Sequence, residues 1–252
     1  MKVQLKSITP NAEKNIVEIA RVSSSREDKG ENLSGLINYL IKHKHWSPFE
    51  HSYMTVEIGT SKAIGIQLLR HRSFTFQEFS QRYAVVEEME PIELRKQAEK
   101  NRQSSEEVFD PIIPDTFGLF EGHNMIASQL INQYLDIGMN IYNELLKKGV
   151  AKECARMILP MATSTTIYMT GSVRSWVHFL DIRDDSHAQK EVQLIAKEIK
   201  KIFVEQLPII SKALGYTLSL PEDAVQGFVD QVNNTMTYVN DKGERTFKAT
   251  KK

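Results

Sequence analysis

Apolar residues recur at helical spacing along much of this 252-residue chain, and this period limits the possible folds more than any other feature. The clearest stripe predicts an amphipathic helix over residues 32–43 and consists of Leu33, Leu36, Ile37, Leu40 and Ile41. Capping and terminating residues predict six further helices. One begins at Pro10 after a Thr9 cap, one runs from Thr60 or Ser61 to about Arg70, and one begins after a Ser186 cap. The other three span residues 122–148, 151–159 and 172–182. Helices are therefore expected to make up most of the fold.

Two segments break the helical pattern with strand signals. Met54, Val56 and Ile58 alternate with polar residues, which predicts a half-buried strand. Residues 162–170 are rich in residues that favour strands.

The domain organisation follows from composition. Residues 87–116 are rich in Glu, Lys, Arg, Gln and Pro, and we expect a partly mobile excursion from the fold rather than a separate domain. We expect a single domain over residues 1–220 and a polar tail over residues 221–252.

Charge and cysteine content restrict the partners and the compartment. Lys and Arg together number 32, as do Asp and Glu, so no global field would attract nucleic acid or a membrane, and we expect neither as a partner. We find no signal peptide and no apolar run long enough to span a membrane. The one cysteine, Cys154, excludes an internal disulfide and is typical of a cytoplasmic protein, which we expect this to be.

Residues 70–83 concentrate three arginines, a histidine, a glutamate and several hydroxyl side chains. Arginine binds phosphate or carboxylate through a planar fork of donors, so this cluster indicates an anion-binding site. The chain has neither G-x-G-x-x-G after a strand nor G-x-x-x-x-G-K-[ST], so side chains would have to bind a phosphorylated ligand. We interpret the segment as a partly buried polar loop of an enzyme. The alternative is a surface loop in which Arg70 and Arg72 pair with Glu78.

Residues 43–51 contain three histidines and a glutamate, which permits a metal site. The spacing lacks the usual zinc patterns, so we favour a loop that lines a pocket, with His45 and Ser47 as polar contacts.

Residues 172–187 place Arg174, His178 and either Asp181 or Ile182 on one helical face. The alternative is that Arg174 and Arg183 only pair with nearby aspartates at the surface.

Residues 152–160 place Arg156 among apolar neighbours, which indicates a buried or interface cation. We favour a core thiol at Cys154 over a nucleophile, because no general base lies beside it in the sequence.

The pattern Arg70-His71-Arg72, seven residues and then Ser80 resembles the R-H-R-x7-S signature of the flavin-dependent thymidylate synthases. Other blocks resemble the same family in the same order, over roughly residues 15 to 210. They are Ala20-Arg21-Val22-Ser23, His45-Trp46-Ser47-Pro48-Phe49-Glu50-His51, Ala155-Arg156 with Leu159-Pro160, and residues 183–189.

This resemblance implies an α+β fold of the thymidylate synthase-complementing type, with helices around a small sheet. It implies a homotetramer whose active sites are shared between subunits. The implied reaction converts dUMP to dTMP, with methylenetetrahydrofolate as carbon donor, reduced FAD as hydride source and NADPH as the reductant of the flavin. The implied reaction uses no cysteine nucleophile. The remaining alternatives are a non-catalytic nucleotide- or RNA-binding protein and a cysteine-dependent thymidylate synthase that uses Cys154.

The resemblance also implies roles for individual residues. The implied FAD contacts are Ser47, Arg70, His71, Arg72, Glu78, Ser172, Val173, Arg174 and His178. The implied dUMP contacts are Gln67, Leu68, Leu69, Arg70, Glu78, Phe79, Ser80, Gln81, Arg82, Arg156 and Arg183. Among these, Arg183 is the implied catalytic residue, because a fixed cation near N3 of uracil would stabilise negative charge on the ring. Arg82 and Arg156 would face the ribose and phosphate.

The chain departs from the family pattern at three positions. Gln77 and His178 stand where many members have Asn, and Thr75 stands where many have Ser. These replacements keep hydrogen-bonding capacity but change its reach, so the flavin contacts are expected to differ in detail.

Overall fold

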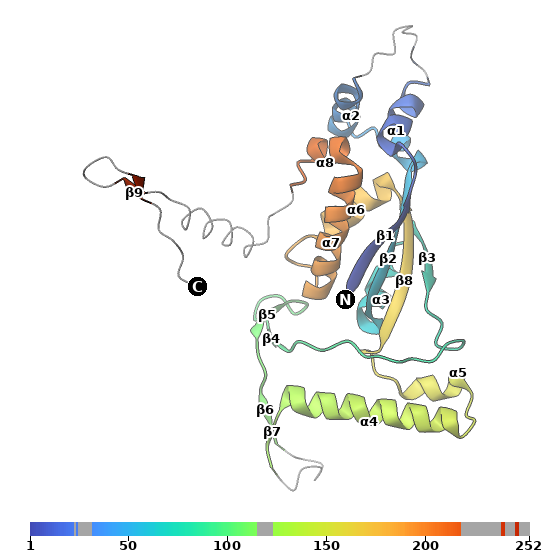
Figure 1. Ribbon diagram of the computed structural model, residues 1–252, viewed down its shortest axis with the longest axis vertical. Coiled ribbons are helices and arrows are strands. Elements are labelled where there is room, and N and C mark those ends of the chain that lie inside the picture. Colours follow the sequence, from blue (N-terminus) through green and yellow to red (C-terminus); the bar gives the residue numbers. More distant parts are fainter. Residues whose placement is uncertain (23, 25–31, 115–122, 218–237, 240–244, 247–252) are drawn as a thin grey trace. The chain divides into compact units, whose positions relative to one another are not determined.

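The computed structural model describes residues 1–22, 24, 32–114, 123–217, 238–239 and 245–246 (Figure 1). The chain divides into two compact units, Met1–Tyr216 and Thr217–Lys252. In the second unit, the strands β9 (Tyr238–Val239) and β10 (Arg245–Thr246) pair antiparallel. Most of the tail predicted over 221–252 lies outside the described residues.

The first unit alternates helices with short and long strands. In chain order its elements are β1 (Lys2–Ile8), α1 (Ala12–Ala20), α2 (Leu33–Lys42), the 3-10 helix η1 (Ser47–His51), β2 (Tyr53–Ser61), α3 (Lys62–Leu68), β3 (Phe74–Glu78), β4 (Arg95–Gln97), β5 (Ser105–Val108), β6 (Ile112–Ile113), β7 (Met125–Ile126), α4 (Ala127–Lys147), α5 (Lys152–Ala155), the 3-10 helix η2 (Arg156–Ile158), β8 (Ser164–Ser172), α6 (Val173–Arg183), α7 (Lys190–Gln206) and α8 (Pro208–Leu214).

A four-stranded antiparallel sheet in the order β1-β2-β8-β3 organises this unit (Figure 1). The two central strands, β2 and β8, pair along their whole length, from Tyr53 opposite Ser172 to Ser61 opposite Ser164. Every second residue of β2 is buried, so one face of the sheet enters the core and the other stays partly accessible. Helix α7 packs against β1, and α6 packs against β8 and α7. The architecture is a mixed helix and sheet fold, as expected.

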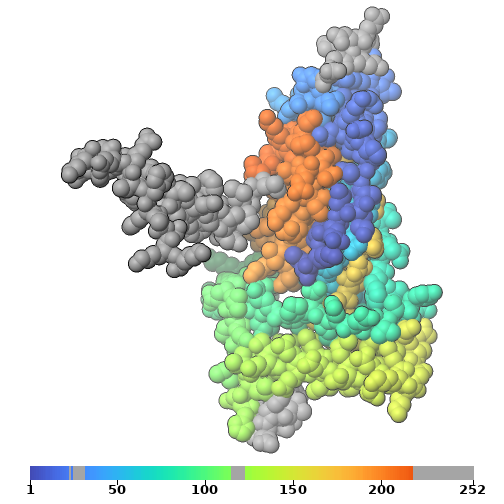
Figure 2. Space-filling model, viewed as in Figure 1, coloured from blue at the N-terminus to red at the C-terminus, as the bar shows by residue number. Residues whose placement is uncertain are grey.

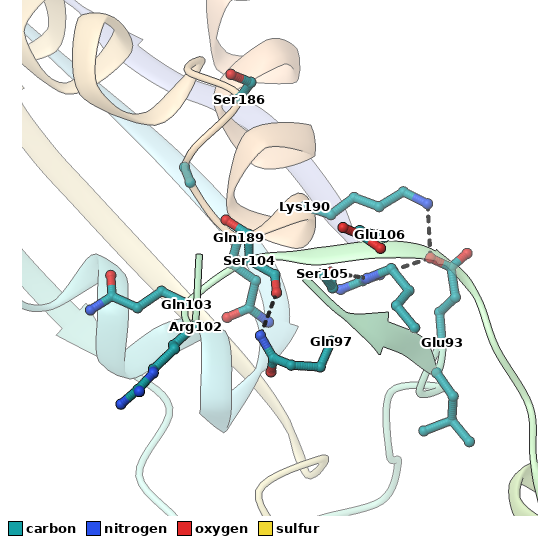
Figure 3. Close-up of a pocket in the computed structure, with 13 residues that line it drawn as sticks. Glu93, Gln97, Arg102, Gln103, Ser104, Ser105, Glu106, Ser186, Gln189 and Lys190 are labelled. Atoms are coloured by element: carbon teal, nitrogen blue, oxygen red, sulfur yellow. Dashed lines mark hydrogen bonds and ion pairs between the residues drawn. The ribbon is translucent and has the colours of Figure 1, made fainter. Parts of the chain in front are cut away.

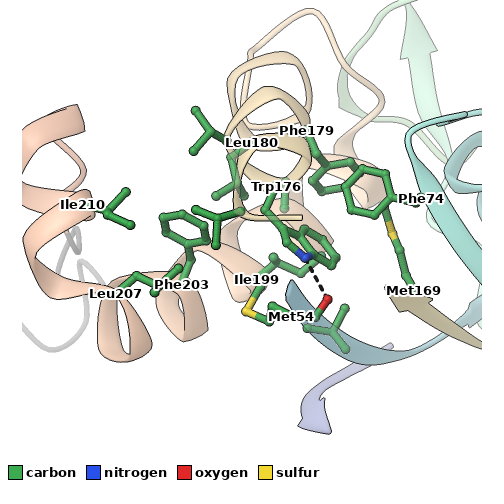
Figure 4. Close-up of a cluster of buried hydrophobic side chains, with 14 of the residues drawn as sticks. Met54, Phe74, Met169, Trp176, Phe179, Leu180, Ile199, Phe203, Leu207 and Ile210 are labelled. Carbon is green, nitrogen blue, oxygen red and sulfur yellow. Dashed lines mark hydrogen bonds between the residues drawn. The ribbon is translucent and has the colours of Figure 1, made fainter. Parts of the chain in front are cut away.

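The core lies between this sheet face and the helices, around Trp176 of α6 (Figure 4). The Trp176 side chain is fully buried, and its Nε1–H donates to the carbonyl oxygen of Met54 at 2.9 Å. Its ring meets Phe74 of β3 edge-on, with centroids 4.6 Å apart. Trp176 therefore connects the central strand, the edge strand and α6.

Gly171 permits the close approach of β3 to β8. It lies opposite Phe74 in the strand register, and a Cβ added there would lie 2.4 Å from the Phe74 ring. Any side chain at this position would have to displace the ring.

A smaller apolar cluster forms on α4 from Val86, Tyr142 and Ala155. The Val86 N–H donates to the Tyr142 hydroxyl at 3.3 Å. Residues 86–90 then run along the end of the main sheet, where Met89 pairs with Thr163, and the segment lies between α4 and the sheet (Figure 2).

Several helix predictions are confirmed with their caps. Ser61 and Ser172 cap α3 and α6 as predicted, and α2 begins after Asn32, a cap that was not predicted; each side-chain oxygen accepts a backbone N–H three residues on. The predicted strands over 54–58 and 162–170 are β2 and β8.

Other predicted helix starts are wrong. Helix α1 begins at Ala12 rather than Pro10, because Asn11 adopts a left-handed conformation with φ of 50° and Thr9 uses its Oγ1 to accept from the Tyr53 N–H. Helix α7 begins at Lys190, so Ser186 is not its cap, and the helix predicted over 122–148 is α4, which begins at Ala127. The helix predicted over 151–159 is the short α5 followed by η2.

Three strand regions were missed by the sequence patterns. Residues 74–78, interpreted as loop, form the edge strand β3, in which Phe74 and Phe76 alternate with polar residues. Strand β1 was not predicted. The excursion over 87–116 contains the hairpin β4–β5 and strand β6, which pairs with β7 further along the chain.

No helix in the described part of the chain is long and apolar enough to cross a membrane.

Candidate active site

The turn between α3 and β3 carries Arg70, His71 and Arg72. The His71 N–H donates to the Leu68 carbonyl at 3.1 Å, and the Phe74 N–H donates to the His71 carbonyl at 3.2 Å. This turn leaves both arginine side chains exposed and the His71 ring half-buried. The three residues thus project from the edge of the sheet next to α6.

His71 and Arg183, which are 112 residues apart in the chain, form a direct hydrogen bond. The Nε–H of Arg183 donates to Nε2 of His71 at 2.9 Å. A ring nitrogen that accepts carries no proton, so the His71 proton lies on Nδ1. The ring also packs edge-on against Phe179, with centroids 5.0 Å apart.

The electrostatics of this pair favour a neutral imidazole. Burial, followed by the charges of Arg183 and His178, lowers the pKa of His71 to about 4. Burial, followed by repulsion from Arg70, lowers the pKa of Arg183 below its ordinary value. The guanidinium of Arg183 therefore has a neutral partner, and a second cation lies nearby.

Glu78 does not pair with Arg70 or Arg72, so the alternative of a salt-bridged surface loop is wrong. Its Oε1 instead accepts from Lys62 Nζ at 2.8 Å and from Thr165 Oγ1 at 2.9 Å. Neither Arg70 nor Arg72 forms an ion pair with any described residue. The turn therefore presents two cations that the described part of the protein leaves without a carboxylate.

The start of α6 borders a cavity of about 530 Å³. Its walls come from η1, the end of the R-H-R turn and one face of α6, and consist of Trp46, Glu50, Ser73, Arg174, Ser175, Val177, His178 and Asp181. The predicted helical face with Arg174, His178 and Asp181 is confirmed. Of residues 43–51, Trp46 and Glu50 line this cavity. His45 and Ser47, the polar contacts expected from the sequence, do not line it.

Arg174 pairs with Glu50 rather than with an aspartate of its own helix. Its Nη1 lies 2.6 Å from Glu50 Oε1, and both side chains are largely exposed. The nearby aspartates have other partners: Asp184 binds Lys200 at 2.8 Å, and Asp185 binds His187 at 2.6 Å. The alternative in which Arg174 and Arg183 pair with these aspartates is wrong.

A second group of expected contacts follows β3. Ser80 is exposed, and its carbonyl accepts the backbone N–H of Tyr83 and of Ala84. Arg82 is exposed and lies 3.3 Å from Glu153. Nε of Arg156 is buried, and it is the one buried side-chain nitrogen or oxygen of the described residues without a hydrogen-bond partner. Among the described residues, no hydrogen bond or ion pair joins this group to the His71–Arg183 pair within the single chain.

Some residues in the expected sets serve the core. Leu68 and Val173 are fully buried in it, main chain included, so within the single chain neither residue offers surface to a ligand. Leu69 packs against the same core, and Phe79 against the smaller cluster on α4. Gln81 is buried, and Ser172 is occupied by capping α6.

Sequence patterns missed the groups that orient the expected residues. Lys62 and Thr165 hold Glu78, and Glu50 holds Arg174, yet each partner is separated from its residue by 16 or more positions. Their only signal was charge or a hydroxyl next to a predicted element boundary.

Cys154 is exposed, so the preference for a core thiol is wrong. Within the described ranges, no group of three or more His, Cys, Asp or Glu residues could hold a metal ion.

The fold and the site together define an α+β protein that presents unneutralised arginines at one sheet edge, as an enzyme for anionic ligands would. The family model for "thymidylate synthase complementing protein" matches residues 4–209. The chain belongs to this family, the flavin-dependent thymidylate synthases.

Individual relatives agree with the family model. A probable flavin-dependent thymidylate synthase from Paramecium bursaria Chlorella virus 1 is 44% identical over 207 residues, which cover 81% of this chain and 91% of the relative. The flavin-dependent thymidylate synthase of Synechocystis sp. is 44% identical over 199 residues, 79% of this chain and 87% of the relative.

A solved structure shares the architecture. The UMP/dUMP methylase PolB from Streptomyces cacaoi, bound with 5-Br dUMP, matches with a TM-score of 0.66 and 26% identity. The match covers 85% of this chain and 94% of that protein.

Proposed function

We propose that this protein methylates dUMP reductively to dTMP, with methylenetetrahydrofolate as carbon donor, reduced FAD as hydride source and NADPH as the reductant. The observation that carries the proposal is the bond between Arg183 and His71 at the end of α6. It joins two distant blocks of the family pattern in one site. Membership of the family supplies the reaction class.

Arg183 is suited to stabilise negative charge on the uracil ring. Its Nε is used by His71, which leaves both Nη groups free to donate to a ligand. Because the imidazole is neutral, the charge of the guanidinium is not cancelled, and its field on a nearby ligand is undiminished. A cation at N3 favours ionisation there and pushes electron density towards C5, the carbon that must attack the methylene group.

The residues around the α6 cavity fit a flavin cofactor. FAD carries two phosphates and an adenine, and this site offers Arg70, Arg72, Arg174 and His178 as donors beside a cavity of about 530 Å³. Such a cofactor would supply the hydride chemistry, and the protein would supply placement and field. Of the other implied FAD contacts, Ser47 and Glu78 would contribute a hydroxyl and a carboxylate, whereas the buried Ser172 and Val173 would support the site by fixing the start of α6.

Arg156 and Arg82 are proposed to bind the phosphate end of dUMP. Nε of Arg156 is a buried donor without a partner, and buried donors cost free energy unless something accepts from them. A phosphate oxygen would meet this need. Ser80, Gln81 and the backbone of Leu69 and Phe79 would complete the binding of the nucleotide, with Gln67 and Leu68.

We propose that the enzyme is a homotetramer with shared sites. Exposed apolar residues on α4 support this, because Tyr134, Ile137 and Ile141 form one helical stripe with 58%, 52% and 48% of each residue exposed. In the part of the chain that the structure describes, no hydrogen bond or ion pair joins the Arg156 group to the His71–Arg183 pair, which is compatible with a site completed by another copy. The single cysteine is compatible with a cytoplasmic enzyme.

The absorbance spectrum of the purified protein tests the function. We expect a yellow protein that releases FAD on denaturation, is bleached by NADPH, and forms dTMP when dUMP and methylenetetrahydrofolate are added. A colourless protein that forms no dTMP with added FAD would contradict the proposal. Light scattering during gel filtration tests the assembly, and a monomer would contradict the shared site.

A further inference from the structure

Arg95, in the β4–β5 excursion, starts a chain of hydrogen bonds that leads to a proposed dUMP contact. Its side chain is only 10% exposed, and all three of its nitrogens have partners. Nε donates to Ser105 Oγ at 2.8 Å, Nη1 to Glu93 at 2.7 Å, and Nη2 to Glu191 Oε1 at 2.6 Å. Residue 95 is thus fixed to the first turn of α7, 96 positions away.

The chain continues from Glu191 to α3. Glu191 Oε2 accepts from Gln189 Nε2 at 2.8 Å, and Gln189 Oε1 accepts from Gln67 Nε2 at 2.5 Å. Gln189 lies on the wall of a polar cavity of about 340 Å³ between the excursion and the start of α7 (Figure 3). Figure 3 also shows Lys190 bonded to Glu93, the other carboxylate on Arg95.

Glu191 sets the direction of every bond in this chain. Burial alone would raise its pKa, but hydrogen bonds from Arg95 and Gln189 hold the pKa of Glu191 below its ordinary value. An ionised carboxylate can only accept, so Gln189 must turn its NH2 group to Glu191 and its oxygen to Gln67. Gln67 must then turn its NH2 group to Gln189, and its Oε1 has no donor among the described residues.

We propose that Arg95 and Glu191 are positioning residues that act through Gln189 and fix the side-chain amide of Gln67 as a hydrogen-bond acceptor for an N–H or O–H group of the nucleotide. This inference rests on the proposed function, because Gln67 is a proposed dUMP contact. The excursion over 87–114 thereby acquires a role in substrate binding. Chains of hydrogen bonds that start at a charge polarise one another, which adds to the preference for one amide orientation.

Glu191→Gln reverses the chain while keeping the size of the side chain. Gln at 191 keeps its oxygen on Arg95 and offers NH2 to Gln189, so both following amides must flip. Gln67 then presents a donor where the nucleotide needs an acceptor. We expect the Kd for dUMP, measured from the flavin absorbance of the holoenzyme, to rise about five- to tenfold, which corresponds to the loss of one hydrogen bond.

A double-mutant cycle separates this role from a structural one. In a Gln67→Ala background, Glu191→Gln should change the Kd for dUMP less than about twofold, because the residue through which it acts is gone. Gln189→Met, at an exposed position, should weaken dUMP binding as Glu191→Gln does, while the ion pair between Arg95 and Glu191 stays intact. Glu198→Gln is the matched control, because Glu198 lies on the same helix in an exposed pair with Lys201 and should leave the Kd unchanged.

Two outcomes would overturn the inference alone. One is unchanged dUMP affinity in both Glu191→Gln and Gln189→Met, and the other is an equal effect of Glu191→Gln with and without Gln67. A wild-type protein that takes up no FAD and no dUMP would overturn the proposed function, and the inference with it.

Discussion

Arg95 and Arg183, two arginines that are at least partly buried, have opposite electrostatic environments. Arg95, which is 10% exposed, is bonded to two carboxylates, and although burial acts against it, the bonds to Glu191 and Glu93 raise its pKa. Arg183 is bonded to a neutral histidine, and burial and Arg70 lower its pKa. The first arginine is neutralised by the fold, whereas the second retains a charge that only a ligand can neutralise. The charge of the hydrogen-bond partner therefore distinguishes Arg95, which stabilises the fold, from Arg183, which is proposed to act in the reaction.

Arg183→Ala should give the largest effect, and it tests the catalytic half of this comparison. We expect dTMP formation to fall about 100-fold, because one donor to the developing charge is lost. The flavin should remain bound, since the residues proposed to hold it are mostly elsewhere. Product formation and the flavin spectrum of the same preparation provide the measurement. Turnover near that of the wild type would remove Arg183 from the mechanism.

Arg95→Met tests the structural half. It leaves Glu191 without its cation and Glu93 with Lys190 alone, and we expect the free energy of unfolding to fall by about 2 kcal/mol. Arg183→Met, the matched variant, should lower it by less than about 0.5 kcal/mol, since removing an unneutralised charge leaves no carboxylate behind. Urea denaturation of both variants measures the two changes in the free energy of unfolding. Equal losses of stability would end the distinction between the two arginines.

His71 should give a smaller, pH-dependent effect. Its pKa is about 4 in the folded state and ordinarily about 6.5, so the unfolded chain binds more protons between these values. Stability contributed by the neutral ring is therefore complete above pH 6.5, is lost as the pH falls towards 4, and changes no further below that. We expect on the order of 1–2 kcal/mol between pH 7 and pH 5, allowing for partial exposure.

The His71→Gln variant provides the control, because glutamine can accept from Arg183 but does not titrate. The wild type should lose more stability than this variant between pH 7 and pH 5 in urea denaturation. Identical pH dependence in the two proteins would show that His71 titrates normally.

Cys154→Ala should have the smallest effect and sets the baseline. The thiol is exposed and lies in neither arginine network, so dTMP formation should stay within about twofold of the wild type. An enzyme that folds and binds FAD but has lost all turnover would instead indicate cysteine chemistry.

Local patterns predicted the features whose cause is local. The caps Ser61 and Ser172 could be found in the sequence, because each binds a backbone N–H three residues away. The R-H-R turn was found through its composition and its likeness to a family. Strand β3 was missed although Phe74 and Phe76 alternate at strand spacing, because the polar residues between them were interpreted as a loop.

Interactions over long distances in the chain could not be predicted. The start of α1 depended on Thr9, whose side chain binds strand β2 instead of capping the helix. The bonds from Arg95 to Glu191 and from Arg183 to His71 join residues separated by 96 and 112 positions. Neither carries a periodic or compositional signal, so the sequence shows which residues are charged but not which charges remain uncancelled.

Because Gly171 has no side chain, strands β3 and β8 can pack closely, and this packing is itself a determinant of turnover. Even a methyl group there would force the Phe74 ring aside, and Phe74 begins the edge strand three residues after His71, which lies in the preceding turn. The displacement would separate the imidazole from the guanidinium on α6 that it orients. A natural variant with alanine at residue 171 would thus resemble an active-site substitution in its kinetics, although residue 171 is not itself one of the proposed ligand contacts.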